Sequence, residues 1–146
     1  MQVIKPKITF FIPNLDTPIP ISFISEGIKA GFPSPAADFE ELKLSLDHLL
    51  IKNKEATFYA KASGTSMIGA GIDDGDILVI DRSLEPRNNA IAICFIDGEF
   101  TVKRIKKENG EVFLMPENPN YKPIKMEPEN ELVIWGIVTY AIKQMK

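Results

Sequence analysis

The sequence predicts a mainly β protein, in which a compact antiparallel body follows an extended N-terminal arm. Segments rich in β-branched and aromatic residues alternate with short turns from residue 56 to residue 140. Two of these turns, Asp97-Gly98 and Asn109-Gly110, are the dipeptides that most strongly indicate β-hairpins. Six of the 11 prolines fall within the first 37 residues, where they disfavour helix. At 146 residues, the chain has a length typical of one domain.

The arm contains one expected strand, near Lys7–Ile12. It is too apolar for a freely solvated tail, because disordered segments are poor in aromatic and β-branched residues. We therefore expect it to lie on a surface, either of its own body or of a partner. The apolar residues concerned are Phe10, Phe11, Ile12, Ile21, Phe23 and Ile24.

A short helical stretch is expected after the arm. Asp38 can cap it, with Glu41 as the reciprocal partner three residues later. Apolar residues then recur at helical spacing, at Phe39, Leu42, Leu46, Leu49 and Leu50. Ser45 can also begin a turn of its own, so the pattern fits either one broken helix or two short ones.

The body is expected to be built from β-strands. The segments expected as strands are 57–62, 76–81, 90–96, 99–105, 111–115 and 131–140. Between the last two, residues 116–128 are polar and interrupted by proline, and this predicts a loop.

Charge and composition narrow the function classes. The net charge of −3 gives no support to a nucleic-acid footprint, which usually makes a domain basic. No apolar run approaches the roughly 18 residues that span a membrane, and the N-terminal run ends at Pro13, too early for a signal peptide. The single cysteine, Cys94, lies in an apolar run and cannot form an intrachain disulfide. We expect a buried thiol and a cytoplasmic protein.

Ser66 is the first candidate catalytic residue. It lies in the small-residue segment Ser63-Gly64-Thr65-Ser66-Met67, in which Gly64 permits a tight turn. Such a turn can expose a hydroxyl, and the backbone N–H groups at Ser66 and Met67 can form an oxyanion site. Taken alone, the pattern is more typical of an ordinary loop serine.

Lys103 is the second candidate and lies 37 residues later. With the period of a strand, it shares a face with Thr101 and Ile105, so burial is possible. A lysine base acting near pH 7 needs its pKa lowered by roughly three units, which burial can supply. The alternative is a solvated lysine in the basic cluster 103–107.

The remaining polar residues suggest ordinary structural roles. His48 is expected to be a surface or capping residue of the helical stretch. Asp73, Asp74 and Asp76 lack the alternating ligands and closing glutamate of a calcium loop, so they are interpreted as a turn. Accordingly, no metal and no cofactor are expected.

Four ordered blocks together resemble the UmuD family, the LexA-related, peptidase S24-like self-cleaving proteins of bacterial SOS mutagenesis. Ala30-Gly31 and the residues that follow are similar to that family's cleavage segment. The second block, Lys61–Met67, is similar to its nucleophile box. The third, Gly71–Asp76, and the fourth, Asp97–Arg104 with the base lysine, follow in the family's order.

The resemblance implies a serine endopeptidase with a Ser66–Lys103 dyad that cuts its own Ala30–Gly31 bond. It implies that residues 1–30 form an arm removed by this cut. Residues 31–146 would form the autoprotease and dimerisation domain, with the β body of LexA C-terminal domains and signal peptidases. Ser66 and Met67 would supply the oxyanion support.

The resemblance also implies partners. These are a second copy of the chain, a RecA filament on single-stranded DNA as co-protease, and the catalytic subunit of an error-prone translesion polymerase. The 30 residues before Gly31 are too few for a helix-turn-helix domain, so sequence-specific DNA binding is not expected, nor is a membrane anchor. Two alternatives stay open: a LexA-type or phage-type repressor regulator without its DNA-binding domain, and a non-catalytic dimeric binding module.

Overall fold

The computed structural model describes residues 8–16, 19–24 and 41–145. The chain forms two compact units, and the larger one combines the residues up to Pro13 with those from Asn53 onward. The smaller unit comprises residues 14–52. The expected cleavage residues Ala30 and Gly31 and the predicted cap Asp38 lie outside the described residues.

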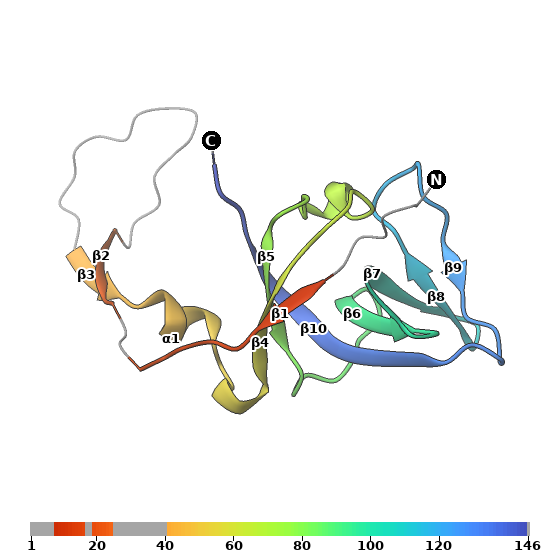
Figure 1. Ribbon diagram of the computed structural model, residues 1–146, viewed down its shortest axis with the longest axis horizontal. Helices are drawn as coiled ribbons and strands as arrows, with labels where there is room; N and C mark the ends of the chain where they lie inside the picture. The colour runs from red at the N-terminus through yellow and green to blue at the C-terminus, as the bar shows by residue number, and fades with distance from the viewer. Residues whose placement is uncertain (1–7, 17–18, 25–40, 146) are drawn as a thin grey trace. The chain divides into compact units, whose positions relative to one another are not determined.

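The larger unit is an antiparallel sheet of eight strands, which confirms the predicted mainly β class (Figure 1). The strand order is β1-β4-β5-β10-β6-β7-β8-β9. The strands are β1 (Thr9–Phe11), β4 (Thr57–Lys61), β5 (Ile77–Asp81), β6 (Ile91–Ile96), β7 (Glu99–Glu108), β8 (Glu111–Met115), β9 (Ile124–Lys125) and β10 (Leu132–Ile142). Two 3₁₀ turns, Lys54–Ala56 and Ile68–Ala70, flank β4 and the loop that follows it.

Both predicted hairpins are present. Asp97 and Gly98 have φ angles of 46° and 87° between β6 and β7, and Asn109 and Gly110 have φ angles of 51° and 76° between β7 and β8. Positive φ at both central residues is typical of the tight turns whose twist matches that of paired strands. These turns fix the register of β7, the strand that carries Lys103.

Strand β10 joins the two halves of the sheet. Its first part pairs with β6 and its second part with β5. The register shifts between Ile134 and Gly136 and again between Val138 and Tyr140. Because bulges bend a strand and increase its twist, β10 can serve both halves, as its curved path shows in Figure 1.

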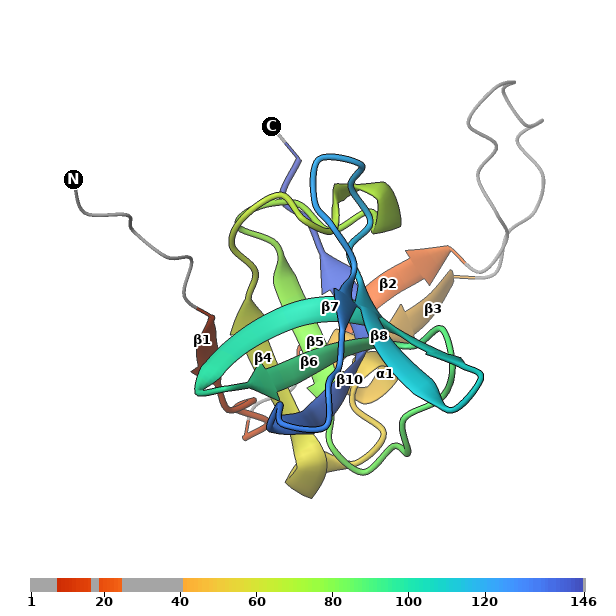
Figure 2. The same cartoon turned by 90° about the vertical axis from the view of Figure 1, so that its right-hand side faces the viewer.

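Two hydrophobic clusters fill the larger unit, and Figure 2 shows the curved strands that enclose them. The first contains Ala60, Ala62, Met67, Ile72, Leu78, Ile80, Ile93 and Val102. The second contains Ala92, Cys94, Ile105, Leu114 and Ile137. Lys103 on β7 is flanked by members of both clusters, and this position explains its burial.

The smaller unit corrects the helix prediction. Strand β3 (Glu41–Leu44) pairs antiparallel with β2 (Ile21–Ile24), and only Leu46–Leu50 form a helix, α1. The expectation that Glu41–Leu44 belong to a helical stretch is therefore wrong. Ser45 occupies the N-cap position of α1, without a side-chain capping hydrogen bond. Pairing with a distant strand has outweighed a local apolar pattern that also fits a helix.

Candidate active site

The loop that carries Ser66 is held from two sides; we call residues 63–67 the serine loop. The first support is the turn at residues 73–76. The Asp74 carboxylate accepts a hydrogen bond from the Gly64 N–H at 2.8 Å. Backbone bonds of 2.8 Å join Ala62 to Gly75 and to Asp76. The predicted turn thus acts as a scaffold for the serine loop.

The second support is the segment after β8, which was expected to be an irregular loop. The Glu117 N–H donates to the Ser66 carbonyl oxygen at 2.8 Å. The side-chain amide of Asn118 donates to the Thr65 carbonyl oxygen at 2.8 Å, and Asn118 is buried. In addition, the Tyr121 and Thr65 hydroxyls lie 3.0 Å apart.

Sequence reasoning did not single out Glu117, Asn118 or Tyr121. The only signal available was an asparagine next to proline in a turn-rich segment, which indicates a turn but not what the turn contacts. These residues lie some 50 positions from the serine loop in the chain, and only the fold brings them to it.

Backbone geometry around Ser66 leaves two donors available. Gly64 has a φ of 89°, so the predicted tight turn uses a conformation that favours glycine. Within the part of the chain that the structure describes, the backbone N–H groups of Ser66 and Met67 donate no hydrogen bond. The Met67 side chain is buried in the first hydrophobic cluster, and this packing holds the serine loop against the core.

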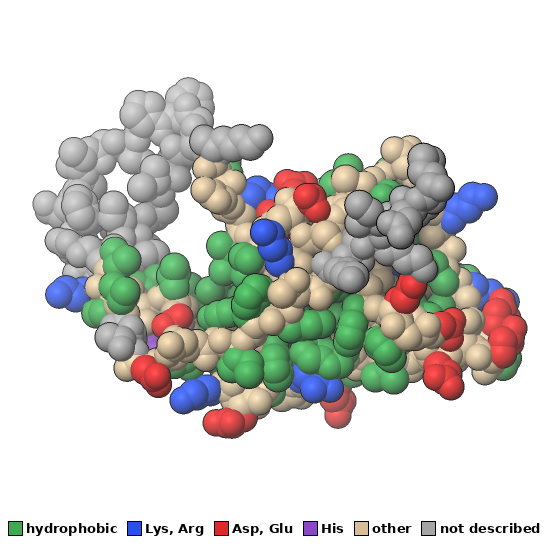
Figure 3. All heavy atoms as spheres, in the orientation of Figure 1, with side chains coloured by type: hydrophobic (Ala, Val, Ile, Leu, Met, Phe, Trp, Pro, Cys, Tyr) green, Lys and Arg blue, Asp and Glu red, His purple; other side chains and the backbone are tan. Residues whose placement is uncertain are grey.

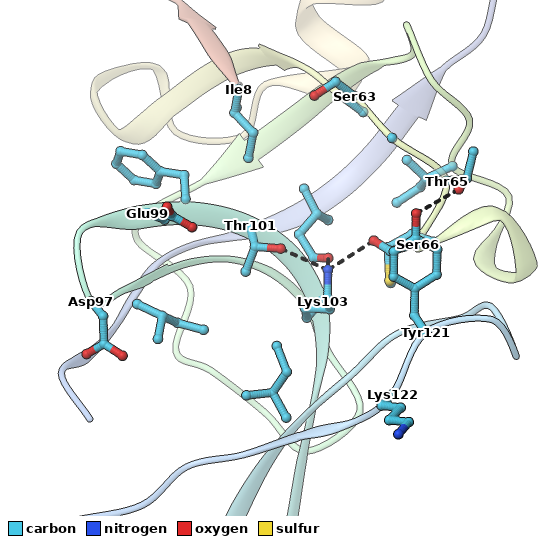
Figure 4. A pocket seen from close by; sticks show the side chains of 18 residues that line it. Ile8, Ser63, Thr65, Ser66, Asp97, Glu99, Thr101, Lys103, Tyr121 and Lys122 are labelled. Atoms are coloured by element: carbon cyan, nitrogen blue, oxygen red, sulfur yellow. Dashed lines mark hydrogen bonds between the residues drawn. The ribbon is translucent and has the colours of Figure 1, made fainter. Parts of the chain in front are cut away.

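Lys103 is buried, and its Nζ points at Ser66 (Figure 4). The Nζ–Oγ distance is 3.0 Å. Nζ also donates to the Thr101 hydroxyl at 2.8 Å and to the Val102 carbonyl oxygen at 3.0 Å. The contact with Thr101 agrees with the shared strand face expected from the alternation.

Burial lowers the pKa of Lys103 below its ordinary value, and the nearby Cys94 thiol opposes this shift to a smaller extent. Among the described residues, no carboxylate forms a salt bridge with Nζ. A neutral lysine amine has two N–H donors and one lone pair. Since Thr101 and Val102 can accept the two N–H groups, the lone pair is free to accept a proton from the Ser66 hydroxyl.

The Ser66–Lys103 pair lies in a cavity of about 630 Å³. Its wall is largely apolar, and Figure 4 shows Ile8 and Tyr121 on opposite sides of it. Apolar side chains from separate elements contribute, namely Ile8, Ile72, Ile96, Phe100, Val102 and Ile124. A cavity of this kind can exclude water from the pair and receive a segment with small side chains.

Comparison with known proteins identifies the family. A family model described as Peptidase S24-like matches residues 22–139. The chain belongs to the peptidase S24-like family. It is 41% identical over 123 residues to Protein MucA of Salmonella typhimurium, covering 84% of each chain.

Two further relatives extend this result. Protein ImpA of Salmonella typhimurium is 40% identical over 124 residues, which cover 81% of this chain and 80% of that protein. LexA repressor 1 of Geobacter sulfurreducens is 34% identical over 112 residues, covering 76% of this chain and 55% of the repressor. The resemblance to the UmuD family is confirmed, and the chain is a UmuD-like S24 serine peptidase of SOS mutagenesis.

The polar residues that the sequence analysis interpreted as structural lie outside the Ser66–Lys103 pair. His48 is exposed on α1. Asp76 is buried, and its carboxylate accepts hydrogen bonds from the Asp73 N–H at 2.8 Å and from Lys143 Nζ at 2.6 Å. Burial raises the pKa of the Cys94 thiol to about 11.

In the basic cluster after Lys103, Arg104 forms an ion pair with Glu117 and Lys106 one with Glu108, while Lys107 is exposed. Among the described residues, no three metal-ligating side chains lie close enough together to hold a metal ion. None of the helices in the described ranges has the length and apolar character of a membrane span.

Proposed function

We propose that Ser66 and Lys103 form the catalytic dyad of a self-cleaving endopeptidase that cuts the Ala30–Gly31 bond. One observation carries the proposal: a buried lysine amine lies 3.0 Å from a serine hydroxyl inside an apolar cavity. Pairing a nucleophile with a base in hydrogen-bond reach is the arrangement that nucleophilic catalysis requires. Membership of the S24 family supports the same reaction class.

The reaction begins when neutral Lys103 takes the proton of the Ser66 hydroxyl as Oγ attacks the Ala30 carbonyl carbon. The carbonyl oxygen acquires negative charge, and the donors that stabilise it are the N–H groups of Ser66 and Met67, which donate to none of the described residues. Lys103 then gives the proton to the Gly31 nitrogen as the C–N bond breaks. Water hydrolyses the remaining ester between Ala30 and Ser66, with Lys103 again as base.

The substrate is the chain's own arm, so residues 1–30 leave and residues 31–146 remain as the processed domain. Covalent attachment gives the cleavage segment a high effective concentration at the cavity. Small side chains at Ala30 and Gly31 allow close approach of their backbone to the serine loop. A protonated Lys103 or an undocked arm keeps the rate low until an activator acts.

The partners follow from the family resemblance. A RecA filament on single-stranded DNA promotes the docked state, and the processed domain forms a dimer that joins a translesion polymerase. The protein acts in the cytoplasm. The net charge of −3 supports a function that does not include sequence-specific binding to duplex DNA.

The test compares purified parent with Ser66→Ala and Lys103→Ala at mildly alkaline pH, following the shorter product on a gel. Each substitution is expected to reduce the rate by at least about 100-fold. Ser66→Ala removes the nucleophile, and Lys103→Ala removes the base, whose catalysis contributes roughly 10²–10⁴-fold. Ser83→Ala and Lys107→Ala, at exposed positions outside the cavity, serve as matched controls and are expected to cut at the parent rate. Parent-like cutting by either dyad variant would overturn the assignment.

A further inference from the structure

Strand β1 belongs to the part of the chain that the proposed cut removes. It lies at the edge of the eight-stranded sheet and pairs antiparallel with β4 (Figures 1 and 2). The register places Thr9 opposite Lys61, Phe10 opposite Ala60 and Phe11 opposite Tyr59. When residues 1–30 leave, β4 becomes the edge of the sheet, with its backbone hydrogen-bonding groups open on one side.

Phe10 is the anchor of β1. Its ring centroid lies 4.6 Å from that of Trp135 and 5.0 Å from that of Phe100. Phe58 also packs on Trp135, at 5.1 Å, so Phe10 completes a group of aromatic rings. We call the space between Trp135 and Phe100 that Phe10 fills the aromatic slot.

Side chains of β1 alternate in their environment. Ile8 lines the cavity that holds the Ser66–Lys103 pair, as Figure 4 shows, and Phe10 enters the aromatic slot. Phe11 is exposed, with half of its surface open to solvent, and Thr9 is exposed as well. Hydrophobic side chains gather on this face of the molecule in Figure 3. The sequence pattern of β1 is therefore an apolar residue that reaches the cavity, an exposed residue of any type, and an aromatic residue that enters the aromatic slot.

We propose that self-cleavage turns the β4 edge and the aromatic slot into a docking site for an extended segment of a partner protein, with an aromatic side chain in the register of Phe10. This inference rests on the proposed cut. Strand β1 occupies the site in the intact chain and keeps it closed. Adding a strand to an exposed sheet edge is a common mode of peptide recognition, in which backbone bonds give affinity and side-chain pockets give specificity.

After the cut, short contacts hold the severed arm. Among its described residues, three pair with β4 and four with β3, and Phe10 fills the aromatic slot. While the arm is attached, its docking is an intramolecular event with a high effective concentration, and the cut removes that advantage. Exchange for a free segment therefore becomes possible once the bond is broken.

The size of the site favours a single extended segment over a second copy of this chain. The paired edge spans three residues of β4. Stable protein–protein interfaces bury about 800 Å² on each partner, which is far more than one short strand edge offers. A linear segment needs no more than this edge and its slot.

The probe for the test is a fluorescein-labelled peptide with the sequence of residues 7–14 of this chain, and the control peptide carries Phe10→Ser. Fluorescence anisotropy compares the self-processed parent, freed of its arm, with the intact Ser66→Ala protein. The processed form is expected to bind the probe at least about tenfold more tightly than the intact form, and at least about tenfold more tightly than it binds the control peptide, because an aromatic anchor is worth more than 1.4 kcal/mol. Equal binding by both forms would overturn the inference.

A full-length Phe10→Ser variant tests the site without any cut. It is expected to bind the probe, whereas the matched variant Phe11→Ser, altered at an exposed position of the same strand, is expected not to. If the parent is never cut but Phe10→Ser binds the probe, the proposed cleavage fails and the docking site stands. If the parent is cut and neither it nor Phe10→Ser binds, the docking site fails and the cleavage stands.

Two other occupants would contradict the proposal in distinct ways. Fragment 1–30 that stays bound through size-exclusion chromatography, and blocks the probe, would show that the arm keeps the site after cutting. A processed dimer that dissociates when the probe is added would assign the site to a second copy of the chain. Circular dichroism of each variant establishes that a loss of binding is not a loss of fold.

Discussion

The rate of self-cleavage is expected to rise steeply with pH, because only neutral Lys103 can accept the Ser66 proton. Below the pKa of the base, the neutral fraction changes about tenfold with each pH unit, and so does the rate. An exposed lysine with a pKa of about 10.4 has only about one amine in a thousand neutral near pH 7.4. The lowered pKa of Lys103 moves the rising part of the pH–rate profile toward neutral pH.

The Thr101 hydroxyl affects the pH range over which the cleavage rate rises. Its hydroxyl accepts a hydrogen bond from Nζ at 2.8 Å, which stabilises the charged ammonium form more than the neutral amine. A hydrogen bond to a charged group contributes about 1.5–3 kcal/mol, and about 1.36 kcal/mol corresponds to one pH unit. Thr101→Val is therefore expected to move the profile to lower pH and to cut about tenfold faster at a fixed pH on the rising limb.

The assay measures initial rates of fragment formation between pH 6 and pH 10 for the parent, Thr101→Val and Thr101→Ser. The serine variant keeps the acceptor and is expected to follow the parent. Circular dichroism at each pH excludes unfolding as the cause of a change. A rate that does not depend on pH across this interval would refute a lysine base, and identical profiles for the valine and serine variants would refute the role of Thr101.

Three further predictions concern packing. Gly69→Ala places a Cβ 2.6 Å from the Glu117 carbonyl oxygen, so it is expected to displace this support of the serine loop and to slow self-cleavage in the gel assay. Gly136→Ala places a Cβ 2.5 Å from Ile80 Cγ2 and is expected to lower the free energy of unfolding by about 1–3 kcal/mol in a denaturant titration. Cys94 is expected to react with iodoacetamide only after unfolding, because it is buried and its pKa is raised to about 11; rapid labelling of the folded protein would contradict its burial.

Local signals predicted much of this fold. The hairpin dipeptides at residues 97–98 and 109–110 fix two turns directly, because few residues other than glycine, asparagine and aspartate adopt positive φ there. Alternation in β7 placed Lys103 on the same face as Thr101, and the structure has their side chains in contact. These features depend on neighbouring residues, which a sequence displays.

Features that depend on distant residues were not predicted. Glu41–Leu44 pair with a strand 20 residues upstream, and no local pattern records that pairing. The hydrogen bond from Asn118 to Thr65 was also not predicted, because the sequence does not distinguish a buried asparagine from an exposed one. The apolar pattern of the arm predicted that it lies on a surface, either of its own body or of a partner. The pairing of β1 with β4 shows that this part of the arm lies on its own body.

The identity of the self-cleavage product tests the central claim most directly. Parent protein and Ser66→Ala are incubated at mildly alkaline pH, with and without a RecA filament on single-stranded DNA, and their intact masses and N-terminal residues are determined. The dyad account predicts two fragments from the parent, with the larger one beginning at Gly31, and an uncut chain from Ser66→Ala. A product that begins at another residue, or equal cutting of both proteins, would contradict it.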